Sequence, residues 1–163
     1  MRLNTSLSTI LGATLLATLT ACGSGADADP FTLIQEGNYA AAVAAIKPQL
    51  ATVEQGSSEH KELLLAYTEA LAVDSPGKAK DEFIAAFDKN KNFLVPKDLV
   101  YIANRMAGEK HLVEAIAVMD KGKKTWPSDE GLSVLLEELK VAASSSGDED
   151  AKSALKGLGY LGD

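Results

Sequence analysis

The sequence predicts an all-α protein built from stacked helical hairpins, and three observations carry this prediction. Alanine and leucine are abundant between residues 30 and 163 whereas aromatic and β-branched residues are sparse, a composition that favours helices. Apolar residues recur there at the 0, 3, 4, 7 spacing of one helix face. Small residues also recur about every 36 residues, a period typical of stacked hairpins. These residues are Ala42, Ala79, Ala115 and Ala151.

The first 21 residues predict a secretory signal peptide. Arg2 gives a positive start, residues 7–19 form an apolar run of about a dozen residues, and small residues precede Cys22. The run is too short for a membrane-spanning helix, which needs roughly 20 apolar residues. Residues 22–29 are mostly small and polar, so we expect a flexible tether ahead of one helical domain at residues 30–163.

The first hairpin is expected to begin at Asp29 and Pro30, which suit the N-cap and the first helical position. The segment 30–36 is short, so the first helix of this hairpin should be incomplete. Pro48 should kink or end the second helix early, because proline removes a backbone donor and clashes with the preceding turn. The turn and the inward-facing residues are expected at Gly37, Asn38, Tyr39, Ala42 and Ile46.

Two fuller hairpins and a fourth follow. Residues 128–130, Ser-Asp-Glu, predict the start of the fourth. In each hairpin the first helix has one apolar face, and the second has a small residue followed four positions later by a large apolar one. The inward-facing residues are Leu63, Ala66, Tyr67, Ala70, Ala79, Phe83 and Ala86, then Leu99, Ile102, Ala103, Met106, Ala115, Met119 and Gly122, then Leu132, Leu135, Leu136, Leu139, Ala151 and Leu155. A third landmark, three residues further on, is Gln49, Ala86, Gly122 and Leu158.

Residues 157–162, Gly-Leu-Gly-Tyr-Leu-Gly, match the nucleotide-binding pattern G-x-G-x-x-G. That pattern binds a pyrophosphate only between a strand and a helix, and the sequence predicts neither here. We expect the glycines to end the last helix instead. Leu158, Tyr160 and Leu161 should then cover the end of the stack.

The sequence offers no catalytic or metal-binding constellation. His60 and His111 are the only histidines, neither has a metal-ligand spacing, and both are expected on solvated helix ends. The adjacent acids at residues 148–150 suit a helix start, where they favour the positive end of the helix dipole. The side chains of Glu137 and Glu138, which are neighbours within a helix, point in different directions. The net charge of −7 has no basic cluster, which argues against nucleic acid and against a polybasic membrane patch. We expect no enzyme activity, cofactor or metal.

The third hairpin resembles the tetratricopeptide repeat, whose outline is W-x2-L-G-x2-Y, A-x3-F and P. The matching positions are Leu99, Ile102, Ala103, Met106, Ala115, Met119 and Pro127. The resemblance covers residues 30–158 in degenerate form, and the second hairpin has Lys91 where the closing proline belongs. It implies a right-handed superhelix of three to four antiparallel helical hairpins. The alternative is an irregular bundle of helices of similar length.

In that family the first helix of each hairpin lines a concave groove that binds a peptide. The resemblance therefore implies Tyr101 as an aromatic anchor, with lysine and asparagine holding a carboxylate or peptide backbone. The groove residues it implies are Lys61, Leu64, Leu65, Thr68, Lys97, Val100, Tyr101, Asn104 and Lys140, with Glu137 beside Lys140. The alternative is that these lysines are solvated and that Tyr101 packs against a neighbouring hairpin.

Residues 19–22, Leu-Thr-Ala-Cys, resemble the bacterial lipobox. In that family the cysteine, here Cys22, becomes the first residue of the mature chain and carries acyl groups such as palmitate, which hold it on the membrane effectively permanently. The residue after the cysteine is Gly23 and not aspartate, which in that family implies the periplasmic face of the outer membrane in a Gram-negative cell. The alternative is a chance cysteine in an uncleaved segment.

Together these features predict a non-catalytic, membrane-anchored scaffold of the cell envelope that binds an envelope protein or peptide in a concave groove. One alternative is a small-molecule-binding or enzyme-accessory lipoprotein, for which a deep enclosed pocket with convergent polar groups is the discriminating feature. Another is a hydrolase, whose signature is two carboxylates with raised pKa values facing each other in a cleft.

Overall fold

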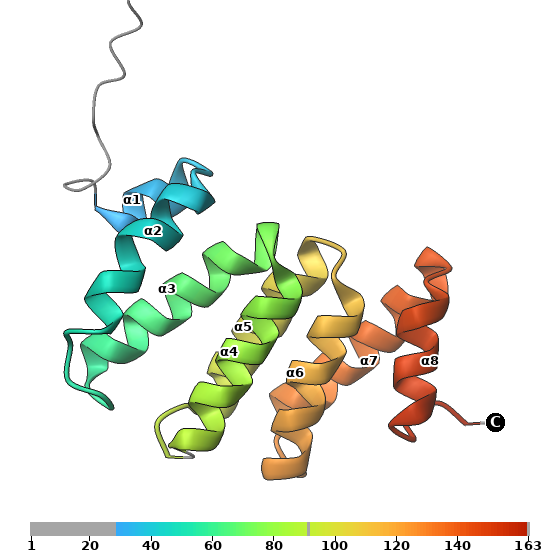
Figure 1. Cartoon of the computed structure of the whole chain (residues 1–163). Helices are drawn as coiled ribbons and strands as arrows, with labels where there is room; N and C mark the ends of the chain where they lie inside the picture. Colours follow the sequence, from blue (N-terminus) through green and yellow to red (C-terminus); the bar gives the residue numbers. More distant parts are fainter. Residues whose placement is uncertain (1–28, 91, 163) are drawn as a thin grey trace, which may run out of the picture.

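The computed structural model describes residues 29–90 and 92–162, and all regular structure in these ranges is helical (Figure 1). This finding confirms the predicted all-α class. The predicted signal peptide, Cys22, residues 23–28 of the tether and Lys91 lie outside the described residues. The helices are α1 (Pro30–Gln35), α2 (Tyr39–Leu50), α3 (Ser58–Asp74), α4 (Pro76–Lys89), α5 (Pro96–Gly108), α6 (Leu112–Thr125), α7 (Glu130–Ser146) and α8 (Glu149–Gly157).

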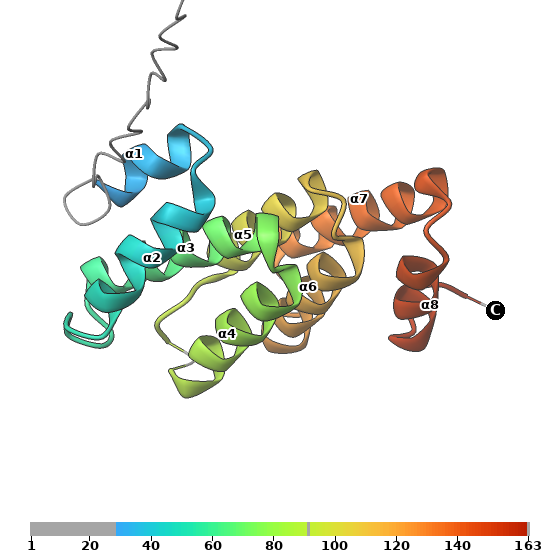
Figure 2. The same cartoon turned by 45° about the horizontal axis from the view of Figure 1, so that its top comes forward.

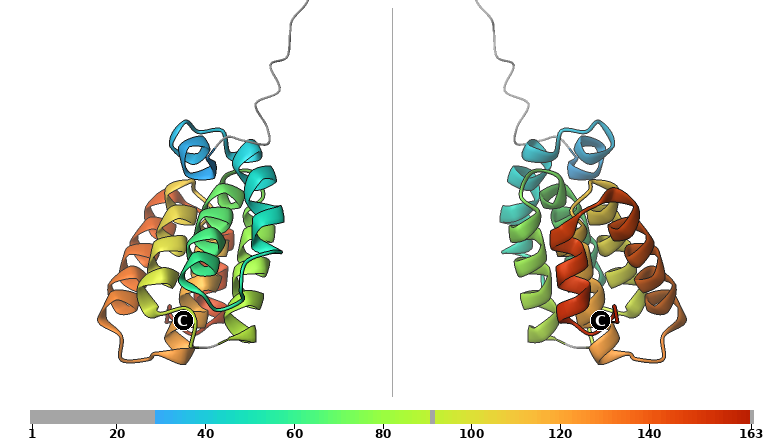
Figure 3. Two further views of the ribbon diagram at one scale, coloured as in Figure 1. Left: turned by 90° about the vertical axis from the view of Figure 1, so that its left-hand side faces the viewer. Right: turned by 90° about the vertical axis from the view of Figure 1, so that its right-hand side faces the viewer.

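The helices form four successive pairs, α1 with α2 through α7 with α8, that stack in chain order (Figures 1 and 2). The first helices α1, α3, α5 and α7 contact one another in succession and make one layer. The second helices α4, α6 and α8 do the same in another layer, while α2 packs against α1 and α3. Figure 3 views this stack from its two ends. The first-helix layer carries exposed residues such as Glu62, Tyr101 and Val134.

Several helices begin and end where the sequence predicts. The carboxylate of Asp29 accepts a hydrogen bond from the backbone N–H of Thr32 at 3.0 Å, and that of Asp129 accepts from Leu132 at 2.9 Å. These caps satisfy N–H groups that have no partner within the helix. Helix α2 ends shortly after Pro48, as expected from the missing proline donor.

The repeated alanines and the large residues after them form the centre of the core. Alanine at the crossing points lets neighbouring helices approach closely. The four alanines, Ala42, Ala79, Ala115 and Ala151, have an exposed fraction of 0%, and the large residues Ile46, Phe83, Met119 and Leu155 are at most 1% exposed. The apolar faces predicted for the first helices of the second, third and fourth hairpins are also buried.

The third landmark of the repeat is only partly buried. A Cβ atom on Gly122 would lie 2.8 Å from Cδ2 of Leu132, so the absence of a side chain allows α6 and α7 to touch. Ala86 is half-buried, whereas Gln49 and Leu158 are exposed. Gln49 lies in the last turn of α2, and Leu158 follows the last residue of α8. The predicted periodicity is therefore wrong at these two positions.

The C-terminal residues fold back on the stack. Helix α8 ends at Gly157, and Gly159 adopts a φ of +79°, which glycine tolerates without steric cost. The hydroxyl of Tyr160 donates to Oδ1 of Asp120 in α6 at 3.0 Å. Tyr160 and Leu161 pack against the core, as predicted for an end cap. The same prediction is wrong for Leu158, which is 37% exposed.

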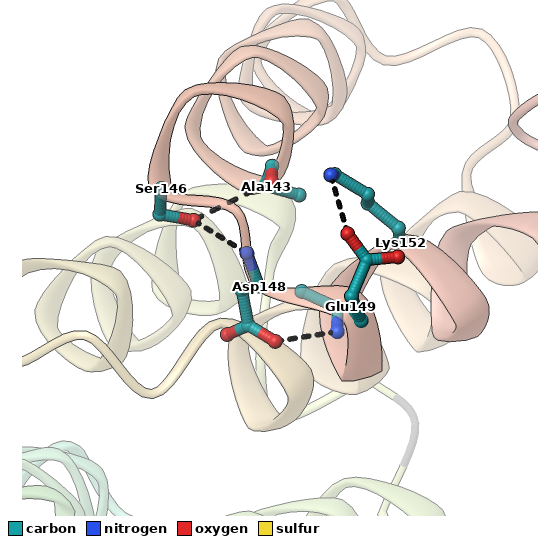
Figure 4. A network of polar contacts seen from close by, with 6 residues as sticks. Ala143, Ser146, Asp148, Glu149 and Lys152 are labelled. Atoms are coloured by element: carbon teal, nitrogen blue, oxygen red, sulfur yellow. Dashed lines mark hydrogen bonds and ion pairs between the residues drawn. The ribbon is translucent and has the colours of Figure 1, made fainter.

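A local polar network holds the turn between α7 and α8 (Figure 4). The hydroxyl of Ser146 donates to the carbonyl of Ala143 at 3.4 Å and accepts from the N–H of Asp148 at 3.3 Å. Asp148 in turn caps the start of α8, and Glu149 pairs with Lys152 at 2.8 Å. These two acids therefore serve the helix start, as expected from the helix dipole.

Candidate functional site

A groove lies on the first-helix layer between α1, α3 and α5, and we call it the α1–α3–α5 groove. Its volume is about 440 Å³. Two aromatic side chains are half exposed there, Phe31 at 42% and Tyr101 at 46%. Clustered exposed apolar side chains are typical of an interaction surface. The lining residues are Phe31, Ile34, Gln35, Glu62, Leu65, Ala66, Glu69 and Tyr101.

A polar network fixes the position of Tyr101 in this groove. The Tyr101 hydroxyl donates to the carboxylate of Glu69, and that carboxylate lies 3.6 Å from Nε of Arg105. Arg105 also donates to the hydroxyl of Tyr39 at 2.7 Å and pairs with Glu109 at 3.0 Å. Because Tyr39 belongs to α2, Glu69 to α3 and Tyr101 to α5, the network ties three helices together at one edge of the groove.

The surroundings of Tyr101 also make its hydroxyl less acidic. Burial, followed by the hydrogen bond to Glu69, raises the pKa of Tyr101 to about 12. Burial is also the main cause that raises the pKa of Tyr67 and of Tyr160 to about 12. The folded state therefore holds these protons more tightly than the unfolded state, in which tyrosine titrates near 10.

We expect an ultraviolet titration of tyrosinate to show this shift. Comparison of the parent protein with Tyr101→Phe should assign to Tyr101 an ionisation near pH 12. By linkage, the stability that the shift contributes is fully present below about pH 10 and is lost as the pH rises towards 12. If the ionisation missing from Tyr101→Phe instead lies near pH 10, the Tyr101 hydroxyl is neither buried nor bonded to Glu69 in solution as it is in this structure.

The structure places only some of the predicted groove residues at the groove. Leu65 and Tyr101 line it. Lys97 and Asn104 are exposed on α5, and Val100 is half-buried against the core. On α7, Nζ of Lys140 lies 2.8 Å from the carboxylate of Glu137. These two predicted residues therefore pair with each other, and neither lines the groove.

Three predicted groove residues of α3 have structural contacts instead. Leu64 and Thr68 are buried, and the Thr68 hydroxyl donates to the carbonyl of Leu64 at 2.8 Å, which satisfies it inside the core. Nζ of Lys61 lies 2.6 Å from Oδ2 of Asp98, whose side chain is only 5% exposed. Asp98 also accepts from the N–H of Val95 at 2.8 Å and so caps α5. Leu64, Thr68 and Lys61 therefore do not line the groove.

Other lining residues were not predicted from the sequence. On α3 the groove side is Glu62 and Glu69 rather than Lys61 and Thr68, and a step of one residue turns a helical side chain by about 100°. Phe31 of α1 was also not predicted, because residues 30–36 match only part of the repeat. The spacing of Phe31 and Ile34 on one face was the signal available. The lining is therefore acidic and apolar, not basic as expected.

A second cleft, of about 520 Å³, lies between the end of α2 and helices α3 and α4. His60 lines it, and its ring lies against Phe93 with the centroids 5.1 Å apart. His60 is half-buried there, so the prediction of a solvated position needs correction; His111 is also half-buried. The lining residues are Leu50, Gln55, Gly56, His60, Leu64, Glu82, Ala85, Ala86, Lys89, Asn90 and Phe93.

Two further findings hold for residues 29–90 and 92–162. No three His, Cys, Asp or Glu side chains gather there in a way that would hold a metal ion. None of the helices in these ranges combines the length and the apolar character that crossing a bilayer requires. Comparison of the whole chain with protein-family models, curated proteins and solved structures finds no match.

Proposed function

We propose that this protein is a non-catalytic interaction scaffold of the bacterial cell envelope, which binds a protein partner in the α1–α3–α5 groove. The observation that carries the proposal is the pair of half-exposed aromatic residues, Phe31 and Tyr101, that line the groove together with Ile34, Leu65 and Ala66. Aromatic side chains presented in this way are typical anchors of protein interfaces. We further propose that the stacked hairpins form a right-handed, tetratricopeptide-like superhelix. Photo-crosslinking from Tyr101 in cells tests the groove.

We propose that Cys22 carries the lipid that anchors this scaffold to the periplasmic face of the outer membrane. The support is the lipobox-like sequence at residues 19–22 with Gly23 after it. Asp29 caps α1, one of the three helices that form the groove. Since a chain extends by at most about 3.6 Å per residue, an anchor at Cys22 would keep Asp29 within roughly 25 Å of the membrane surface. A bound partner would then also be held close to the bilayer.

Changing Cys22 to alanine is expected to move the protein from the membrane to the soluble fraction. The reason is that acyl chains contribute about 0.8 kcal/mol per buried methylene, and the variant has no thiol to carry them. Fractionation of cells that express the full chain, with immunodetection, measures the effect. Ser24→Ala serves as the matched control and should leave the protein on the membrane. Equal membrane retention of both variants would end the lipid-anchor proposal.

A second candidate function is the binding of a small molecule in the cleft between α2, α3 and α4. The observation that favours it is that the His60 and Phe93 rings lie beside the polar side chains of Gln55, Lys89 and Asn90 in that cleft. Binding there should be weakened by His60→Ala and left unchanged by Tyr101→Ala. A partner bound in the α1–α3–α5 groove should show the opposite pattern in the same assay.

A further inference from the structure

The charge of the α1–α3–α5 groove is one-sided. Its lining includes two carboxylates, those of Glu62 and Glu69, and no basic side chain. Glu69 already accepts from Tyr101 and faces Arg105. Glu62 is exposed and has no hydrogen-bond or ion-pair partner among the described residues. One negative charge therefore remains without a partner at the edge of an apolar surface.

The lining elements limit how a partner can bind. They are helices, whose backbone groups are already hydrogen-bonded, so an extended peptide cannot add to them as a strand adds to a sheet edge. Recognition must use side chains. The apolar side chains of Phe31, Ile34, Leu65 and Tyr101 face the groove together. An amphipathic helix that lays its apolar stripe into such a groove is the recognition mode that suits this surface.

We infer that the occupant of the groove is an amphipathic helix of a protein partner, with lysine or arginine beside its apolar stripe to pair with Glu62. The inference rests on the proposed scaffold function and names the chemistry of the partner. Arginine or lysine opposite Glu62 adds an exposed ion pair at the rim of the interface, which favours the correct partner and register. Such a contact is weakened by salt.

A second copy of this chain suits the groove less well. The most exposed large apolar residues on its described helices are Val134 and Val141 of α7, at 51% and 67%. Glu138 lies between them on the same helix face and is exposed. Docking of α7 from another copy would bring Glu138 towards the unpaired Glu62. Like charges brought together in this way oppose association.

Two synthetic helical peptides of equal length test the inference. Both carry the same leucine stripe, and its border holds lysine in one peptide and glutamate in the other. The full chain is placed in phosphatidylcholine nanodiscs, and fluorescence anisotropy gives the dissociation constant of each labelled peptide, with empty nanodiscs as the baseline. Glu62→Gln removes the proposed partner of lysine. Glu138→Gln is the matched control, because it removes the same charge outside the groove.

We expect the lysine peptide to bind more tightly than the glutamate peptide. Glu62→Gln should weaken the lysine peptide about two- to fivefold at low salt, and Glu138→Gln should leave it unchanged. Glu62→Lys should shift the preference towards the glutamate peptide.

The variant Tyr101→Ala separates this inference from the proposed function. If both peptides bind equally and Tyr101→Ala weakens both, the groove binds helices but the charge inference is wrong. If the two glutamate variants have equal effects, the attraction comes from the overall charge and the inference is again overturned. If neither peptide binds, or Tyr101→Ala changes nothing, both the inference and the proposed groove fail.

Discussion

Replacing Phe83 by alanine is expected to lower the free energy of unfolding by about 3–5 kcal/mol. Phe83 is 1% exposed in α4, a helix that packs against both α3 and α6. Truncation removes the transfer free energy of the ring and leaves a cavity where two hairpins meet. Urea denaturation followed by circular dichroism measures the change.

Phe31→Ala is the matched control, because it makes the same chemical change at a residue that is 42% exposed. Its cost should stay below about 1 kcal/mol. Phe83 occupies the large position of the repeat, with Ala79 one helical turn before it. Similar losses for the two variants would show that this register does not face the core in solution.

Changing Asp98 to alanine is expected to cost about 3 kcal/mol of stability, the lower end of the range for breaking a buried ion pair. The carboxylate is 5% exposed and serves two partners, Nζ of Lys61 at 2.6 Å and the N–H of Val95 at 2.8 Å. The expected cost is at the lower end because the Lys61 side chain is 24% exposed. Its ammonium group can therefore turn towards water once Asp98 is removed.

A double-mutant cycle with Lys61→Met separates the ion pair from the cap. Without the lysine, Asp98→Ala removes only the cap of α5 and should cost about 1 kcal/mol. The two changes should therefore be non-additive in urea denaturation. If they add to within about 0.5 kcal/mol, Lys61 and Asp98 do not interact, and Lys61 becomes available for the groove again.

The helices themselves could be predicted because local and tertiary signals agree. Leu99, Ile102 and Met106 lie on one face by spacing alone, and that face is buried. Asp29 and Asp129 mark helix starts because a carboxylate at the N-cap satisfies free N–H groups wherever the helix later packs. Gln49 lies in the last turn of α2, where its side chain is exposed and donates to the carbonyl of Ala45, so the predicted periodicity fails there.

The groove could be predicted only in outline. Tyr101 and Leu65 line it as expected, but the choice between Lys61 and Glu62 depends on a rotation of about 100° that a degenerate repeat does not define. The pairing of Lys61 with Asp98 depends on how α3 and α5 cross, which no local pattern contains. Thr68 is buried although it is polar, because its hydroxyl bonds to the helix backbone.

Site-specific photo-crosslinking in living cells tests the central claim that the partner docks in the α1–α3–α5 groove. A photoreactive amino acid is placed in the full chain at Tyr101, at Phe31 or at Val113. Val113 is 38% exposed on α6 in the other layer. We predict adducts with the same protein from Tyr101 and Phe31, and none from Val113. Adducts from Val113 with none from Tyr101 would contradict the account.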